Sequence, residues 1–86
     1  MENESILEEL LDLAEKIGME VRRASLSGQG GGLCVLRGRR ILVVDVGLPP
    51  TDQVAQTAGA LAGLPELEEM YLKPALRETL EANRQD

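Results

Sequence analysis

The chain has 86 residues, enough for one small domain, and its 43% of apolar and 28% of charged residues are typical of globular rather than disordered proteins. Because it has a single cysteine, one Tyr and no Trp, Phe or His, no disulfide can form within the chain and the core must be aliphatic. The formal net charge of −6 counts against general binding to nucleic acid, whose phosphates an acidic chain repels.

The first element is an amphipathic helix, predicted for residues 3–17. Apolar side chains such as Ile6 and Leu10 recur at steps of three and four, and acidic residues fill most of the remaining positions. Lys16 suits the negative end of the helix dipole, and Gly18 is a natural C-terminal stop.

Three strands are expected next, over residues 19–26, 33–37 and 40–46. Charged side chains in the first strand indicate an edge of the sheet. The glycine-rich segment 27–32 has no side chain that would order it, so it is predicted to be a flexible connection. Gly38 indicates a hairpin between the second and third strands, and the continuous apolar run of the third strand predicts cover on both faces.

The remainder of the chain is helical in pattern. A second helix begins with Pro50 at its first position or with Thr51 as its cap, and the Leu64-Pro65 pair ends it. Residues 66–69 form a short acidic turn, and a last helix is expected over about 74–83, followed by a few frayed polar residues.

These elements predict a single α+β domain spanning residues 1–86, in the order αβββαα. A three-stranded, mainly antiparallel sheet with helices packed on it is expected, and a fourth short strand near Tyr71 is an open alternative. No segment has the length of a membrane span, and the acidic N-terminus has the wrong sign for a secretory signal, so a cytoplasmic location is expected.

Few residues offer chemistry. The glycines from Gly28 to Gly32 precede a strand rather than a helix, which argues against a phosphate-binding loop. Cys34 lies among apolar residues with no His to stabilise a thiolate, so it is interpreted as a small buried core residue rather than a nucleophile. With no His and one Cys, no metal site and no cofactor is expected, and the acids at 66–69 are interpreted as a solvated face.

Polar residues in the middle of the chain are candidates for binding. Arg37, Arg39 and Arg40 are expected to cluster at the hairpin tip, where they could dock an acidic partner or the acidic helices of a second copy, or simply keep the turn soluble. Asp45, at the end of the third strand, is a paired buried acid, a site residue or, more simply, a strand end close to solvent.

A groove between the glycine loop and the second helix is a further candidate. Its polar groups would be Gln29, Asp45 and Gln53. A small molecule or peptide would need those groups to converge on one pocket.

The segments "IGMEV" and "GGLCVLRGRRILVVDVGLP", followed by Gln53 and an alanine-rich helix, resemble the N-terminal scaffold of ImmA/IrrE-type metallopeptidases over about residues 5–64. In that family the helix carries the zinc motif HExxH, whose positions correspond here to Gly59, Ala60 and Gly63. The resemblance therefore implies a scaffold without the reaction. The chain also resembles small uncharacterised bacterial α/β proteins.

The sequence thus favours a non-catalytic protein-interaction module over an enzyme. Its acidic ends, basic middle and aliphatic core suggest self-association as a homodimer, or a protein partner, rather than nucleic acid or a membrane. The alternatives are a small-molecule or peptide binder and an inactive metallopeptidase-like scaffold.

Overall fold

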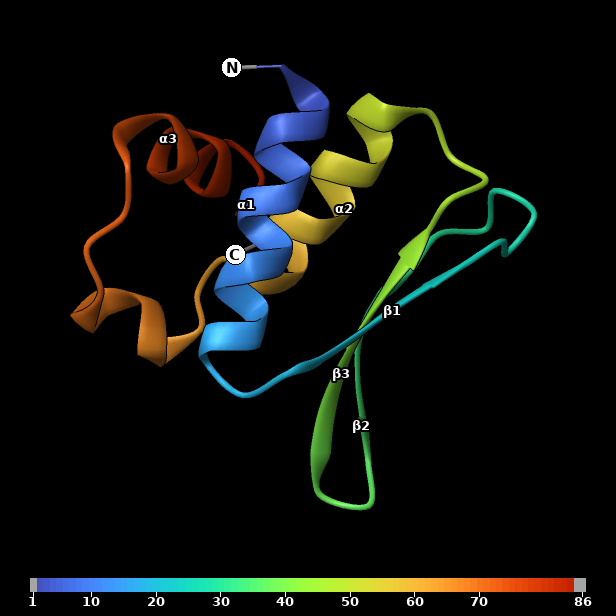
Figure 1. Ribbon diagram of the computed structural model, residues 1–86, viewed down its shortest axis with the longest axis horizontal. Helices are drawn as coiled ribbons and strands as arrows, with labels where there is room; N and C mark the ends of the chain where they lie inside the picture. Colours follow the sequence, from blue (N-terminus) through green and yellow to red (C-terminus); the bar gives the residue numbers. More distant parts are fainter. Residues whose placement is uncertain (1, 85–86) are drawn as a thin grey trace.

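The computed structural model describes residues 2–84, in which two helices pack against a three-stranded sheet and a third helix packs on those two (Figure 1). The elements follow the expected αβββαα order, with a short 3₁₀ helix before the last α-helix. Their bounds are α1 Asn3–Lys16, β1 Glu20–Ala24, β2 Gly32–Leu36, β3 Arg39–Asp45, α2 Pro50–Leu61, η1 Pro65–Glu69 and α3 Pro74–Ala82. Part of the expected frayed C-terminus, residues 85–86, lies outside the described residues.

The sheet is mixed, and the prediction of a mainly antiparallel sheet was wrong. The strand order is β1-β3-β2, with β1 parallel to β3 and β2 antiparallel to it. The loop after β1 carries the chain past the end of β3 to the far side, so that β1 and β2 are not neighbours. The expectation failed because it assumed that consecutive strands pair, whereas here only β2 and β3 do.

The β2–β3 hairpin was predicted from Gly38 and is confirmed, with a tighter turn than expected. Arg37 and Gly38 both have positive φ, at 53° and 78°, as a type I′ two-residue turn requires. The flanking residues Leu36 and Arg39 pair directly.

The core lies between the sheet and the helices and is aliphatic, as predicted. Leu10 of α1, Leu42 of β3 and Leu61 of α2 are fully buried at its centre. Tyr71, by contrast, is 84% exposed and lies in an irregular segment, so within residues 2–84 no fourth strand forms there.

Only one face of the sheet is covered by helices (Figure 1). Leu42 and Val44 point into the core, while alternate residues of β3 face the other way. On that second face Ile41 is only 4% exposed, while Val43 is half-buried and Arg39 is exposed. The expected cover of β3 on both faces is therefore found only in part.

The last helix, α3, packs against α1 and α2. Pro50 occupies the start of α2. Further along the chain, η1 contributes Leu67 to the core, and α3 contributes Leu76 and Leu80.

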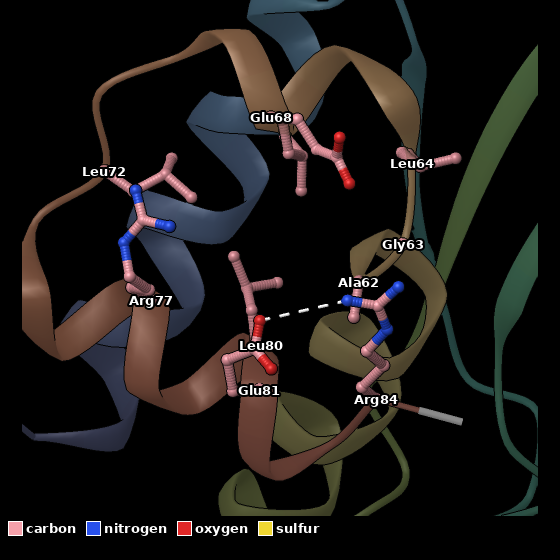
Figure 2. Close-up of a pocket in the computed structure, with 10 residues that line it drawn as sticks. Ala62, Gly63, Leu64, Glu68, Leu72, Arg77, Leu80, Glu81 and Arg84 are labelled. Atoms are coloured by element: carbon pink, nitrogen blue, oxygen red, sulfur yellow. Dashed lines mark ion pairs between the residues drawn. The ribbon is translucent and has the colours of Figure 1, made fainter. Parts of the chain in front are cut away.

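A cavity of about 300 Å³ lies between the end of α2, η1 and α3 (Figure 2). Its rim carries acidic and basic side chains together, and Glu81 and Arg84 approach to 4.0 Å across one turn. Charges of both signs at one opening favour no particular ligand charge.

Candidate functional site

Asp45 is the organising residue at the end of β3 and is 1% exposed, so the interpretation as a solvent-exposed strand end was wrong. Its Oδ1 accepts hydrogen bonds from the backbone N–H groups of Leu26 (3.0 Å) and Gly47 (2.8 Å). Its Oδ2 accepts one from the N–H of Gly30 at 2.8 Å. A buried carboxylate is tolerable because these donors compensate for the water it has lost.

The same donors set the protonation state of Asp45. The hydrogen bond from the Leu26 N–H, supported by those from Gly30, Gly47 and Gly28, lowers the pKa of the Asp45 carboxyl against the opposing effect of burial. Asp45 is therefore charged at neutral pH, with both oxygens occupied. This arrangement assigns Asp45 to holding the β1–β2 loop rather than to binding a ligand.

The glycine-rich loop is anchored, contrary to the expectation of a flexible connection. Besides Asp45, the side chain of Gln56 on α2 holds it by accepting a hydrogen bond from Gly31 N–H at 2.7 Å. A Cβ on Gly31 would lie 2.0 Å from the carbonyl oxygen of Val43, so the loop can cross β3 at this distance only with glycine there. The ordering side chains come from distant positions, which a local inspection of the loop cannot reveal.

Gln29 and Gln53, the other two members of the expected groove, differ in their surroundings. Gln29 is exposed on the loop. Gln53 donates from Nε2 to the carbonyl oxygen of Leu48 at 2.8 Å, which ties the start of α2 to the preceding turn. Two of the three polar groups proposed for a ligand, on Asp45 and Gln53, are thus engaged in hydrogen bonds within the fold.

Two of the three arginines expected to cluster at the hairpin tip form ion pairs within the fold. Arg40 donates to Glu66 on η1 at 2.5 Å and to the carbonyl oxygen of Ile17 at 3.1 Å. The hydrogen bond from Arg40 lowers the pKa of Glu66 and raises that of Arg40 itself. Glu66 is therefore a partly exposed partner of the sheet, while Glu68 and Glu69 are exposed, as the interpretation of a solvated face expects.

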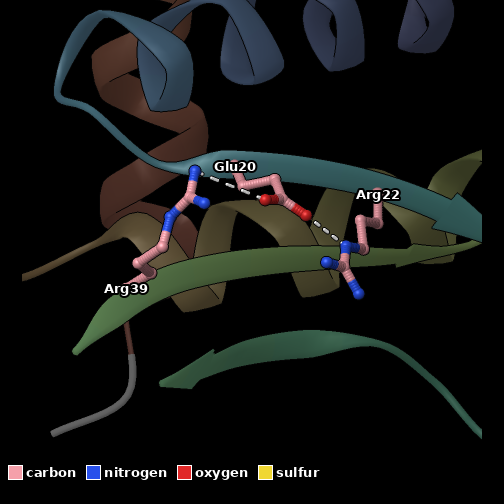
Figure 3. A network of polar contacts seen from close by, with 3 residues as sticks. All are labelled: Glu20, Arg22 and Arg39. Atoms are coloured by element: carbon pink, nitrogen blue, oxygen red, sulfur yellow. Dashed lines mark hydrogen bonds and ion pairs between the residues drawn. The ribbon is translucent and has the colours of Figure 1, made fainter. Parts of the chain in front are cut away.

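Arg39 faces the uncovered side of the sheet. It approaches Glu20 of β1 to 3.5 Å, and Glu20 also pairs with Arg22, so that the three side chains lie across β1 and β3 (Figure 3). Of the three tip residues only Arg37, in the turn, has no ion pair with another described residue.

Charged side chains protect the edge formed by β1 against pairing with another strand. Glu20 and Arg22 pair on its open face, and on the helical face Arg23 reaches Glu8 of α1 at 2.5 Å. Charged side chains on an edge strand oppose pairing with another chain. The prediction that this strand forms a charged edge is confirmed.

The edge formed by β2 is different, because it is bare and apolar. Val35 is 67% exposed, Leu36 54% and Leu33 36%, and Cys34 is exposed as well. The interpretation of Cys34 as a buried core residue was therefore wrong. It followed from apolar neighbours in sequence, but those neighbours lie on an outer strand and are themselves exposed.

Two residues of β2 direct their backbone groups away from its partner strand β3. The turn bonds Leu36 to Arg39, and hydrogen-bonded pairs alternate with non-bonded pairs along an antiparallel ladder. Leu33 and Val35 fall on the non-bonded positions opposite Leu42 and Arg40, so their N–H and C=O groups point away from β3. This edge, residues 32–36, is the candidate functional site.

A shallow depression of about 270 Å³ adjoins this edge on its helical side. It lies where the side chains are smallest, between Gly31 and Gly32 at the start of β2 and Gly59 and Ala60 on α2. Sequence reasoning missed the edge because strand order decides which strands are outermost. The uncharged run Leu33–Leu36 was the one local signal of it.

Other chemistry is sparse in the described residues. Within residues 2–84, no group of three or more Asp, Glu or Cys side chains could hold a metal ion, and no helix is long and apolar enough to cross a membrane. Comparison of the chain with protein-family models, with curated proteins and with solved structures found no match.

Proposed function

We propose that the chain is a non-catalytic protein-interaction module that binds an extended, apolar segment of another protein chain along the free edge of β2. The observation that carries the proposal is the exposed apolar strand with outward N–H and C=O groups at Leu33 and Val35. An added strand would satisfy those groups and cover the exposed side chains.

Two features of the molecule support this choice over the alternatives. The expected small-molecule groove has lost its polar groups to internal hydrogen bonds at Asp45 and Gln53. The single thiol, on Cys34, lies exposed on the β2 edge, and the sequence has no His that could serve as its base. The metallopeptidase-like scaffold and a cytoplasmic location stay predictions from the sequence.

Selection of peptides from a random heptapeptide display library against the full chain tests the proposal. We expect the selected peptides to be extended, with alternating apolar residues, and to shift the amide resonances of Leu33 and Val35 in NMR spectra. N-methylation of alternate peptide bonds should abolish binding, because it removes the donors that pair with a strand.

The matched variants are Val35→Lys and Val46→Lys. Both replace an exposed valine, at 67% and 46% exposure, but only Val35 lies on the edge. We expect Val35→Lys to weaken peptide binding about tenfold or more and Val46→Lys to leave it unchanged. Selected peptides that bind away from β2, or equal binding to both variants, would overturn the proposal.

A further inference from the structure

We infer that the segment which pairs with β2 is β2 of a second copy, antiparallel and centred on Cys34, an inference that rests on the proposed function of this edge. A two-fold axis through the strand is the symmetry by which most homodimers form. Both copies would then contribute to one continuous sheet with their helices on the same side.

The backbone selects the register. Outward-pointing groups must face outward-pointing groups, so Leu33 and Val35 of one copy have to meet residues of the same kind in the other. Centring the pairing on Cys34 places Leu33 opposite Val35 of the second copy, and Val35 opposite Leu33. This register also overlaps all five residues of Gly32–Leu36, whereas a shift in either direction leaves part of the strand unpaired.

Side chains fit the same register. Leu33 and Val35 lie on the helical side of the sheet and are 36% and 67% exposed, so each would cover the other across the junction. Val35 and Arg37 of the second copy would come to lie opposite Leu33 and Gly31. That position is the rim of the depression beside β2, where glycines leave room for them.

Two copies of this acidic chain can approach each other along the β2 edge without bringing acidic side chains together. Residues 21–44 contain no Asp or Glu, so pairing here brings no acids together. Arg37, without an ion pair to a described residue, would approach the α2 face of the second copy that carries Gln56. Asp52 lies on that face one turn earlier and also has no ion pair with a described residue. The two copies would exchange Arg37–Asp52 contacts symmetrically.

The register makes Cys34 face Cys34. Residues at a non-hydrogen-bonded antiparallel position have Cα atoms about 4.5 Å apart, which is within the range that a disulfide spans. Diamide then serves as a probe: each thiol loses a proton, one sulfur–sulfur bond forms, and the two electrons and two protons pass to the azo bond, giving a hydrazine. A five-residue edge is small, so a weak dimer with a dissociation constant in the micromolar range is expected.

The matched control moves the thiol by one position, in the double variant Leu33→Cys/Cys34→Ser. Its cysteines would be offset by two residues along the paired strands, which places their Cα atoms about 8 Å apart, beyond disulfide range. We expect the wild-type chain to cross-link with diamide about tenfold faster than this variant, because pairing raises the effective concentration of Cys34 next to its mate.

Size-exclusion chromatography with light scattering on the full chain completes the test. The wild type and Val46→Lys should approach about twice 9.3 kDa with rising concentration, and Val35→Lys should stay at the monomer mass. A monomer at millimolar concentration that still binds selected peptides at β2 would overturn this inference and leave the proposed function standing. A dimer that cross-links equally fast through position 33 would overturn the register.

Discussion

The two edges of the sheet differ in whether another strand can pair with them. The β1 edge carries Glu20, Arg22 and Arg23, each engaged in an ion pair within the molecule. The β2 edge carries four consecutive uncharged residues, all of them exposed. Solvent exposure is common to both edges, so exposure alone does not mark a binding site. The difference indicates that an edge is protected by charges and left available where charges are missing.

Both edges depend on the loop that joins them across the end of β3, and the largest expected effect follows from blocking that crossing. Gly31→Ala would place a methyl group 2.0 Å from the carbonyl oxygen of Val43, so the backbone must move. We expect a loss of about 2–4 kcal/mol in the free energy of unfolding, measured by urea denaturation.

Gly38→Ala is the matched control for that variant. A Cβ there meets nothing within 4 Å, and its cost of about 1 kcal/mol would come only from the positive φ of 78°. Equal losses for the two variants would show that the close approach of the loop to β3 does not limit stability.

Asp45→Asn tests the hydrogen bonds that hold the crossing, with a smaller expected effect than Gly31→Ala. The variant loses the charge and turns an N–H₂ group toward backbone donors. Because folding lowers the pKa of Asp45, the unfolded state binds the proton more readily, and the stabilisation is complete above the ordinary Asp pKa of about 3.9. It is lost as the pH falls through the lowered value.

The difference in unfolding free energy between wild type and Asp45→Asn should therefore shrink as the pH is lowered from about 7 to about 3. Denaturation series at several pH values measure it. A difference that is constant over this range would mean that the carboxylate charge contributes nothing.

Glu20→Gln is expected to have the smallest effect, since it removes only partly exposed ion pairs with Arg22 and Arg39 from the β1 edge. Such pairs contribute about 1 kcal/mol or less, and salt reduces the contribution. Thermal unfolding at low and high salt measures it, with Glu78→Gln as a control that removes an acid without an ion pair to a described residue. A larger loss would show that the β1 edge is closed by more than surface charge.

Local sequence patterns predicted the helices and strands well, but they did not predict which strands lie next to each other in the sheet. The helical periodicity around Leu10, the glycine in the hairpin and the proline at Pro50 predicted two helices and a hairpin close to their observed bounds. These signals depend on residues a few positions apart. The pairing of Glu20 with Ile41 does not, because it depends on the path of a loop that spans the end of another strand.

The same contrast between local and long-range signals holds for the candidate site. Cys34 was expected to be buried and is exposed, and Asp45 was expected near solvent and is buried. Both expectations failed because burial depends on strand order, which sequence periodicity does not reveal. One local signal for Asp45 was present: Gly47 follows it by two residues, and an aspartate accepting from the N–H two positions on is the Asx turn that the structure contains. Nothing comparable in the sequence marks the role of Gln56.

The exposure of Tyr71 has a consequence for spectroscopy. It is the one aromatic side chain of the sequence and lies between η1 and α3, outside the core. Ultraviolet absorbance and intrinsic fluorescence therefore observe a surface segment and are nearly blind to the packing of the leucines around β3. Melting of that interior is visible instead in far-ultraviolet circular dichroism and in the methyl resonances of its aliphatic side chains.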